Sequence, residues 1–360
     1  LLREFPFKEY TIPYKENSSS LKKSRKKINL KFNTYKKDNY LDFCLKVIPF
    51  IIPEIYTNKF HKFEELIKKS VLNKNPKVII TAESQWHDEV FKYWAAREIG
   101  KKCKLYIIQH GGSYGTNLFS FFEEHETKIS DKFFVWGWSD QAKNLCNFPI
   151  NIIKSSDYGK WDKNGTLLLT TNYLSKSFVS QMHPTSHNAD KSFEYSKIIT
   201  YLLSNLISKI KTKVTLRTYP GEEFIPEQIK FFEKQKRIFI SKEKLIKNDY
   251  YSSKLIICAY YFSSTFLECM ALNLPCILML DESFDPLRES IDGLIDNLYK
   301  AKICHKSIDS LCNHLKSIED NVELWWESDE VNLAKNKFRN YFAYNKITIS
   351  EAILNILKQS

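Results

Sequence analysis

A histidine followed by two glycines stands out in the stretch LYIIQHGGSYG, which begins at Leu105. Three of the nine glycines of the chain lie here, Gly111, Gly112 and Gly115, directly after an apolar run. If that run is a buried strand, His110 lies at the carboxyl edge of a sheet, where α/β proteins bind ligands. Without a Cβ, Gly111 or Gly112 can take a positive φ or approach a ligand closely. An imidazole there can hold a phosphate or move a substrate proton; a structural turn histidine is the alternative.

A second polar cluster lies in YYFSSTFLECMALNLPCI, residues 260–277. Ser263, Ser264 and Thr265 stand between an expected strand and an expected helix. The N–H groups and partial positive charge of a helix N-terminus suit a phosphate. Glu268, expected in the first helical turn, can accept the two hydroxyls of a ribose. The alternative is a plain capping box with Thr265 as the cap.

Charged and aromatic side chains supply further candidates. Arg217 ends an expected strand, so it is a candidate clamp for a donor phosphate or a sugar carboxylate; otherwise it pairs with an acidic neighbour. Asp88 and Glu89 are the first-half candidates for a general base or a nucleophile, or else they complement a helix dipole. Trp136 and Trp138 could stack on a sugar, but aromatic residues beside a strand are more often core. No Asp-x-Asp motif occurs, so no metal and no other cofactor is expected.

Short β-rich runs alternate with helical patterns, and the alternation occurs twice. The expected strands are 76–81, 105–109, 132–136, 166–170, 214–217, 237–240, 255–259 and 275–280, and the expected helices are 84–101, 192–211, 266–272 and two within 329–359. Such alternation predicts parallel sheets covered by helices.

The predicted fold class is therefore α/β, with two Rossmann-like domains facing a central cleft. We expect an N-terminal, acceptor-side domain at 1–157 and a nucleotide-sugar domain at 158–328, joined near 156–165. Residues 329–360 are expected to be C-terminal helices, and whether they pack back on the first domain stays open. His110 and Ser264 are expected to face one another across the cleft.

Composition narrows the class of protein. At 360 residues, with 43% apolar residues, the chain can bury two cores. Its net charge of +12 favours anionic partners. The Lys-rich stretch 21–36 could touch anionic lipid or be a solvated loop. There is no zinc motif, RNP-like strand or helix-turn-helix spacing, so a nucleic-acid partner is not expected. Eight scattered cysteines without Cys-x-x-Cys predict a reducing cytoplasm, with peripheral association at the inner face of a bacterial cytoplasmic membrane left open. No apolar run approaches the ~20 residues of a membrane span.

Several motifs carry a family resemblance. "SSTFLECMALNLPCI" resembles the donor-binding segment of GT-B glycosyltransferases, whose usual form is Ser-x-x-x-Glu followed by Ala-x-x-x-Pro. "QHG" is similar to an element of bacterial capsule and lipopolysaccharide transferases that use CMP-activated acidic sugars, and to a His-Gly of the teichoic acid glycerophosphate polymerases. The transferases of O-antigen gene clusters resemble the chain at "QWHDEVFKYWAA", "QHGGSYG", "FFVWGW", "LRTYP" and "SSTFLE", which together span residues 85–268. Many relatives have His-Pro where this chain has Tyr219-Pro220; His183-Pro184, in a polar loop, is not taken as that motif.

The resemblance implies a GT-B glycosyltransferase that adds a sugar to a bacterial surface glycan such as O-antigen or capsule. The implied donor is a CMP-activated acidic sugar of the Kdo or nonulosonate type, and the implied acceptor is a glycan or lipid-linked glycan. A CDP-glycerol-type glycerophosphotransferase is the alternative enzyme. A nucleic-acid-binding or glycan-binding protein without catalysis is the alternative outside enzymes.

Overall fold

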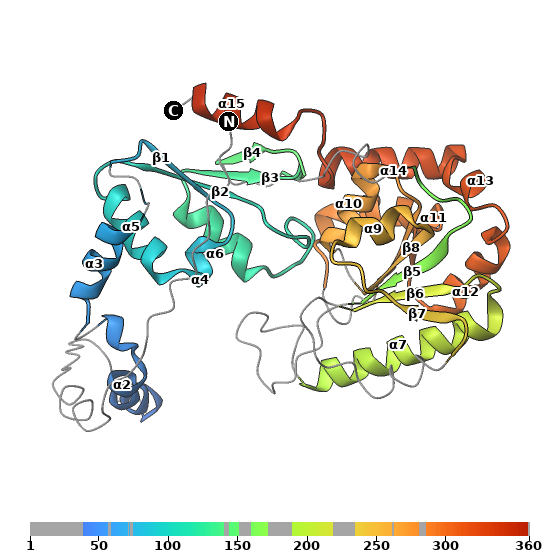
Figure 1. The fold of residues 1–360 in the computed structure, drawn as a ribbon, viewed down its shortest axis with the longest axis horizontal. Coiled ribbons are helices and arrows are strands. Elements are labelled where there is room, and N and C mark those ends of the chain that lie inside the picture. Colours follow the sequence, from blue (N-terminus) through green and yellow to red (C-terminus); the bar gives the residue numbers. More distant parts are fainter. Residues whose placement is uncertain are drawn as a thin grey trace. The chain divides into compact units, whose positions relative to one another are not determined.

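The fold is seen in a computed structural model (Figure 1). The structure describes residues 39–56, 59–70, 72, 75–139, 144–150, 160–171, 189–218, 235–260, 263–280 and 286–358. The chain divides into two compact units. One contains helices α2 (Asn39–Ile51) and α3 (His61–Lys69), the 3₁₀ helix η1 (Glu54–Tyr56) and residues 88–98. The other contains residues 75–87 and the chain from residue 99 onward, and so holds both sheets.

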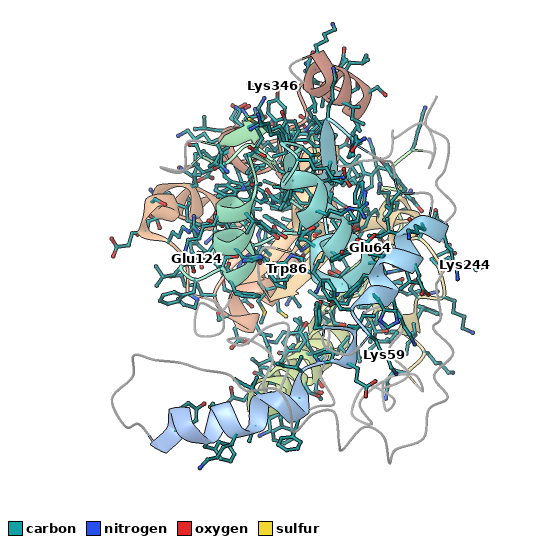
Figure 2. All side chains as sticks on the ribbon, turned by 90° about the vertical axis from the view of Figure 1, so that its left-hand side faces the viewer. Lys59, Glu64, Trp86, Glu124, Lys244 and Lys346 are labelled. Atoms are coloured by element: carbon teal, nitrogen blue, oxygen red, sulfur yellow. The ribbon has the colours of Figure 1, made fainter. Side chains whose placement is uncertain are left out.

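The first unit is held by aromatic packing between α3 and α5 (Glu89–Ile99). The rings of Phe63 and Tyr93 stack with centroids 5.0 Å apart, and Phe63 is fully buried. The Tyr93 hydroxyl donates to Glu64, labelled in Figure 2, at 2.6 Å. This hydrogen bond, with the charge of Arg97 nearby, lowers the pKa of Glu64. An apolar face, the Tyr93–Glu64 hydrogen bond and the Arg97–Glu64 ion pair therefore join the two helices.

The first sheet contains four parallel strands in the order β1-β2-β3-β4. Their bounds are Val78–Thr81, Lys104–Ile108, Lys132–Val135 and Leu145–Asn147. The strands expected at 76–81, 105–109 and 132–136 are present, whereas β4, only three residues long, was not expected. The helix expected at 84–101 is interrupted at Asp88, which separates α4 (Ser84–His87) from α5. Helix α6 (Phe121–Ile129) contacts β3.

The second sheet contains six parallel strands in the order β10-β9-β8-β5-β6-β7. They are β5 (Thr166–Thr170), β6 (Val214–Arg217), β7 (Ile238–Ile240), β8 (Ser253–Tyr260), β9 (Cys276–Leu280) and β10 (Cys304–His305). The chain builds outward from β5 to β7, returns to place β8 beside β5, and then builds the other way. This reversal is a topological switch point, and α/β sheets bind ligands beyond the carboxyl ends of the strands at such a point.

Helices cover the second sheet. An apolar core joins β5, β6, β8 and β9 to α7 (Ala189–Lys209) and α12 (Ile308–Ile318). Helix α10 (Ser264–Leu272) packs against β8, β9 and α14 (Asp329–Phe342), where the rings of Phe266 and Phe338 meet at 5.5 Å. The remaining helical elements are α9 (Ile246–Tyr251), η3 (Glu289–Ile291), α11 (Asp292–Lys300) and α13 (Val322–Trp326). The packing of α10 against β8, β9 and α14 fixes the position of its N-terminus beside the switch point.

The C-terminal helix α15 (Ile349–Lys358) packs on the first sheet rather than the second. Its Ala352 and Ile356 are buried with Tyr106, Phe134 and Phe148. Helix α14, in contrast, contacts α10 and α11. The two helices expected after residue 329 thus pack in different places. The domain boundary expected at 157/158 lies outside the described residues. No described helix is both long and apolar enough to cross a lipid bilayer.

Candidate functional site

The loop after β2 is built on Gln109, the first residue of the QHG motif, for which the sequence predicted no role of its own. Its side chain is buried, and its amide oxygen accepts from Trp136 N at 3.0 Å and from Trp138 Nε1 at 2.8 Å. Its amide nitrogen donates to Gly111 O at 2.8 Å. Trp136 and Trp138 are themselves buried, so the core interpretation holds for them and sugar stacking does not. The glutamine therefore fixes the turn that presents His110.

Gly111 or Gly112 is predicted to take a positive φ or to approach a ligand closely. The positive φ angles of this loop fall on Ser113 (68°) and Gly115 (71°) instead, so for Gly111 and Gly112 the close approach to a ligand is the alternative that stays a prediction. A Cβ on Gly115 would lie 2.5 Å from the Trp138 ring, which no relaxation of this packed site accommodates cheaply. Gly115 is thus the position of the loop where conformation and space both require glycine.

Gly112 instead brings the loop to the second sheet. Its N–H donates to Ser264 Oγ at 3.0 Å, and Ser264 is the first residue of α10. The cap of this helix is Ser263, whose hydroxyl accepts from Phe266 N at 3.4 Å. The alternative of a capping box with Thr265 as the cap is therefore wrong by two residues, because Ser263 keeps an extended backbone while Ser264 is already helical. The structure joins the two polar clusters of the sequence.

Glu268 lies in the second turn of α10, not in its first as expected. Its carboxylate accepts from the Tyr250 hydroxyl at 3.1 Å. Burial raises its pKa, and the Lys247 charge and the Tyr250 hydrogen bond oppose that rise in part. A role in holding a ribose stays a prediction for this carboxyl.

His110 faces a buried carboxyl on α6. Its Nδ1 lies 3.6 Å from Glu126 Oε1, and the Glu126 side chain is completely buried. Tyr114 lies between the two, with its hydroxyl 3.1 Å from His110 Nδ1 and 2.8 Å from Glu126 Oε2. Histidine, tyrosine and glutamate therefore form one hydrogen-bonded group.

Neutral donors surround Glu126. Its Oε1 accepts from Gln85 Nε2 at 2.8 Å and from Trp86 Nε1 at 2.6 Å, while Oε2 accepts from Tyr114 (Figure 2 labels Trp86). Burial raises the pKa of Glu126 to about 7, although these hydrogen bonds lower it. Among the residues that the structure describes, no cation other than a protonated His110 contacts Glu126. Its charge is therefore poised to respond to a proton on that histidine.

The network sets the direction of the hydrogen bonds. Burial, then the neighbouring Glu126, raises the pKa of Tyr114, which keeps its hydroxyl protonated and donating to Glu126. The Tyr114 oxygen can then accept from His110 Nδ1–H, which leaves Nε2 as the basic nitrogen. This is the arrangement of a general base oriented by a third group.

Glu123, one turn before Glu126 on α6, is a second carboxyl that binds the same loop. Its Oε2 accepts from Gly115 N at 2.8 Å, and its Oε1 pairs with Arg288 Nη2 at 2.5 Å. Arg288 also donates from Nε to Asn117 O at 2.8 Å, and Leu287 forms an antiparallel bridge with Asn117. The segment after β9 is thus fastened to the loop that carries His110.

Arg217 is used inside the second sheet. It is buried, and its Nη1 donates to Asp249 Oδ2 at 2.5 Å, to Glu243 O at 2.9 Å and to Ser241 Oγ at 3.3 Å. The structure shows the ion pair with an acidic neighbour that was the alternative, and a role as an anion clamp stays a prediction for Arg217. Strand β6 ends where α9 supplies that acid, so Nη1 of the guanidinium is committed.

Asp88 and Glu89 lie in the other compact unit. Asp88 Oδ1 accepts from Phe91 N at 2.9 Å, a helix-start contact, and Glu89 pairs with Lys92 one turn on. Both contacts belong to the alternative of helix-terminal acids. A catalytic role stays a prediction for the two residues, and the carboxyl that the structure brings to His110 is Glu126.

The sequence held a weak signal for the missed carboxyls. Glu123 and Glu126 occur three residues apart in FFEEHETKI, and that spacing places both on one helical face. Tyr114 lies 12 residues from Glu126, whereas Arg288 lies 165 residues from Glu123, so only the first partner could be suspected from the local sequence.

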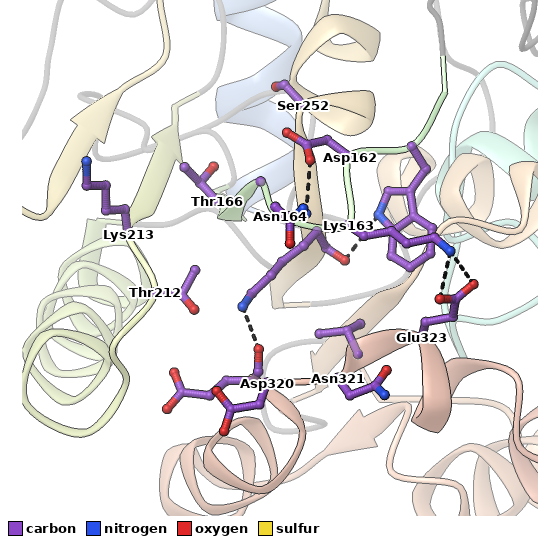
Figure 3. A pocket seen from close by; sticks show the side chains of 15 residues that line it. Asp162, Lys163, Asn164, Thr166, Thr212, Lys213, Ser252, Asp320, Asn321 and Glu323 are labelled. Carbon is purple, nitrogen blue, oxygen red and sulfur yellow. Dashed lines mark hydrogen bonds and ion pairs between the residues drawn. The ribbon is translucent and has the colours of Figure 1, made fainter.

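A separate cavity lies at the second sheet. A cavity of about 550 Å³ is lined by residues at the amino ends of β5, β6 and β8, among them Thr166, Thr212 and Lys254 (Figure 3). Lys254 donates there to Glu319 O at 2.6 Å. Because parallel sheets bind ligands at their carboxyl ends, this cavity is not the candidate site. Among the residues that the structure describes, no group of three or more His, Cys, Asp or Glu side chains is arranged to hold a metal ion.

Comparison with known proteins supplies a family and a fold. A model of the LIC12162 family transferases matches residues 1–357. Among solved structures, the chain is similar to a UDP-GlcNAc 2-epimerase of Neisseria meningitidis bound to UDP-GlcNAc, with a TM-score of 0.50 and 11% identity over 85% of this chain and 82% of that one. MurG of Acinetobacter baumannii has a TM-score of 0.44 and 10% identity over 85% and 78% of the two chains. A search of curated proteins found no match. The predicted GT-B fold class is confirmed.

Proposed function

Because the chain belongs to the LIC12162 family of transferases, we propose that it is a glycosyltransferase that uses a nucleotide-activated sugar. One contact carries the proposal: Gly112 N donates to Ser264 Oγ at 3.0 Å. It joins a loop bearing a histidine with a buried carboxyl partner to a helix N-terminus at a topological switch point. A group that can take a proton and an element that can hold a phosphate thus lie together.

The donor is proposed to bind at the start of α10. Ser263, Ser264 and Thr265 supply hydroxyls there, and the helix dipole favours a phosphate. We propose that Gly111 and Gly112 also line this donor-binding part of the site. The resemblance of QHG to transferases of acidic sugars supports a CMP-activated donor of the Kdo or nonulosonate type.

The proposed acceptor is a bacterial surface glycan such as O-antigen or capsule, free or lipid-linked. The transfer would take place in the cytoplasm, with peripheral association at an anionic membrane surface as part of the proposal. The Lys-rich stretch 21–36 that supports this association lies outside the described residues.

The transfer is proposed as a direct displacement. An acceptor hydroxyl oxygen attacks the anomeric carbon, and the bond from that carbon to the phosphate oxygen breaks. The electron pair leaves with the nucleotide, which for a CMP-sugar departs as CMP. The hydroxyl proton goes to His110 Nε2, and Tyr114 with Glu126 stabilises the resulting imidazolium. A positioned base of this kind contributes roughly 10²–10⁴-fold.

Nucleotide selectivity and one variant test the proposal. Melting temperatures measured with CMP, CDP, UDP and GDP should rise most with CMP, because ligands that bind the folded state stabilise it. A selective rise with CDP would favour the glycerophosphotransferase. His110→Ala should slow consumption of the selected nucleotide sugar by roughly 10²-fold at an unchanged melting temperature. His61→Ala, at an exposed histidine of the other unit, is the matched control. Unchanged turnover with a lowered melting temperature would make His110 a structural turn residue.

A further inference from the structure

Exposed aromatic side chains gather beside His110. Phe119 is 69% exposed, and Phe121, two residues later, is 54% exposed; Trp86, which is partly exposed, contacts Phe121. The rings of Trp86 and Phe121 meet with centroids 5.1 Å apart. We call Trp86, Phe119 and Phe121 the aromatic surface. Large apolar side chains that stay in water at a protein surface commonly mark a binding site.

The aromatic surface is continuous with the catalytic candidates. Trp86 Nε1 donates to Glu126 at 2.6 Å, and the Trp86 ring meets Phe122 edge-on at 4.9 Å. Phe122 in turn meets the His110 ring at 5.7 Å. The Phe122 ring therefore lies between the aromatic surface and His110, the proposed proton acceptor. A molecule bound to the aromatic surface would lie close to that histidine.

Topology places this surface at the ligand-binding edge of the first sheet. Trp86 lies on α4, which directly follows β1, and Phe119 lies in the loop that follows β2. Phe121 is the first residue of α6. All three residues thus come from segments that leave the carboxyl edge or begin beside it, where parallel sheets bind their substrates.

We propose that the aromatic surface is the acceptor subsite and binds the apolar face of a pyranose ring. The C–H bonds on one face of a sugar ring form an apolar plane, which gains free energy by covering an aromatic ring. Two exposed polar side chains, Glu83 directly before α4 and His125 of α6, whose ring meets that of Trp86 at 5.0 Å, can pair with the sugar hydroxyls. That mixture of rings and polar groups suits a carbohydrate, because a sugar has hydroxyl groups that can pair with the polar side chains and an alkyl chain has none. The proposal rests on the proposed glycosyltransferase function.

Saturation-transfer NMR with simple glycosides tests the subsite. The probes are the methyl glycosides of glucose, galactose, mannose and N-acetylglucosamine, each at millimolar concentration. At least one should receive saturation from the protein, and Phe121→Ala and Phe119→Ala should each reduce that transfer at least about fivefold, since lost ring burial lowers affinity. Both residues are exposed, so folding should persist. Phe193→Ala, at a phenylalanine of α7 that is also 54% exposed, is the matched control and should change nothing.

The outcomes separate the subsite from the proposed function. Equal transfer in Phe121→Ala and the wild type, or no transfer to any of the four glycosides, overturns the carbohydrate subsite. Binding of octanoate in their place, lost in Phe121→Ala, would make the surface a site for an alkyl chain and also overturn the proposal. The same variants are measured with the four nucleotides. A wild-type protein that binds none of them refutes the proposed function instead.

Discussion

Two of the buried acidic side chains, Asp249 and Glu126, have contrasting neighbours. Asp249 lies behind the second sheet and is matched by the guanidinium of Arg217 at 2.5 Å. Glu126 lies behind the loop of the first sheet and is held by an amide, an indole and a phenol. Burial raises the pKa of Glu126 to about 7. A buried carboxylate that is paired with a cation stabilises the structure. A buried carboxylate that accepts only from neutral donors can change its own protonation when a nearby group gains or loses a proton.

From the sequence, Arg217 is a functional candidate and Glu126 is not; their surroundings in the structure reverse that order. Arg217 ends a strand beside a proline and looked like an anion clamp, whereas Glu126 lies in an unremarkable helix. The role of a buried charged side chain depends on its neighbours. The neighbours that decide it here, Asp249 for Arg217 and Tyr114 for Glu126, come from other elements of the fold. The predictions below separate the two kinds of carboxyl.

The largest effect is expected from breaking the compensated pair. Arg217→Ala leaves Asp249 buried without its cation, which should lower the free energy of unfolding by roughly 3–5 kcal/mol. Urea denaturation measures this, and nucleotide affinity at a temperature where the variant is folded should be unchanged. Arg217→Met with Asp249→Leu removes both charges and should recover most of the loss. A stable Arg217→Ala variant with weakened nucleotide binding would restore the anion clamp.

Glu126→Gln should act on turnover more than on folding. The glutamine oxygen can still accept from Trp86, but its NH₂ group would donate to Tyr114, whose hydroxyl would then donate to His110 Nδ1. The basic nitrogen would be lost from Nε2, and turnover should fall by roughly 10²-fold.

Nitrogen-15 shifts of the His110 ring report the tautomer directly. They should show the proton on Nδ1 in the wild type and on Nε2 in Glu126→Gln. Glu124→Gln, at an exposed acid of the same helix, is the control and should change neither quantity. The same tautomer in both proteins would remove Glu126 from the orientation of His110.

The uncompensated carboxyl should also give stability a pH dependence. Its folded-state pKa of about 7 lies above the ordinary value of 4.5, so the folded protein binds the extra proton between these values. Its contribution is therefore fully present below pH 4.5 and is lost as the pH rises to 7, by roughly 2–3 kcal/mol. Unfolding free energies of the wild type and Glu126→Gln, compared from pH 4.5 to 8, should diverge by that amount. A constant difference across this range would mean that Glu126 stays charged when buried.

The sequence predicted the parts of the fold that depend on local pattern. Alternation of apolar strands and helices located most strands of both sheets and the fold class, because each strand carries its own signal. Strand β10, at Cys304–His305, is too short to carry one. For the site, His110 and Ser264 were chosen on loop chemistry, and the structure places their loops in contact. Glu126 and Asp249 were missed because their significance comes from partners in separate elements.

Glu268 is the intermediate case and gives the smallest expected effect. Burial raises its pKa, Tyr250 donates to it, and Lys247 adds a nearby positive charge, so its neighbours resemble partly those of Glu126 and partly those of Asp249. If the carboxylate also accepts ribose hydroxyls, Glu268→Ala should weaken CMP binding about tenfold, or about 1.4 kcal/mol, as measured by calorimetry. Tyr250→Phe removes the hydroxyl that Glu268 accepts from and keeps the acid, so it should leave CMP affinity near that of the wild type. Equal losses in the two variants would mean that Tyr250 and Glu268 support the fold of α10 together. A loss confined to Glu268→Ala would instead assign the carboxylate to the nucleotide, and with it the start of α10 to the donor.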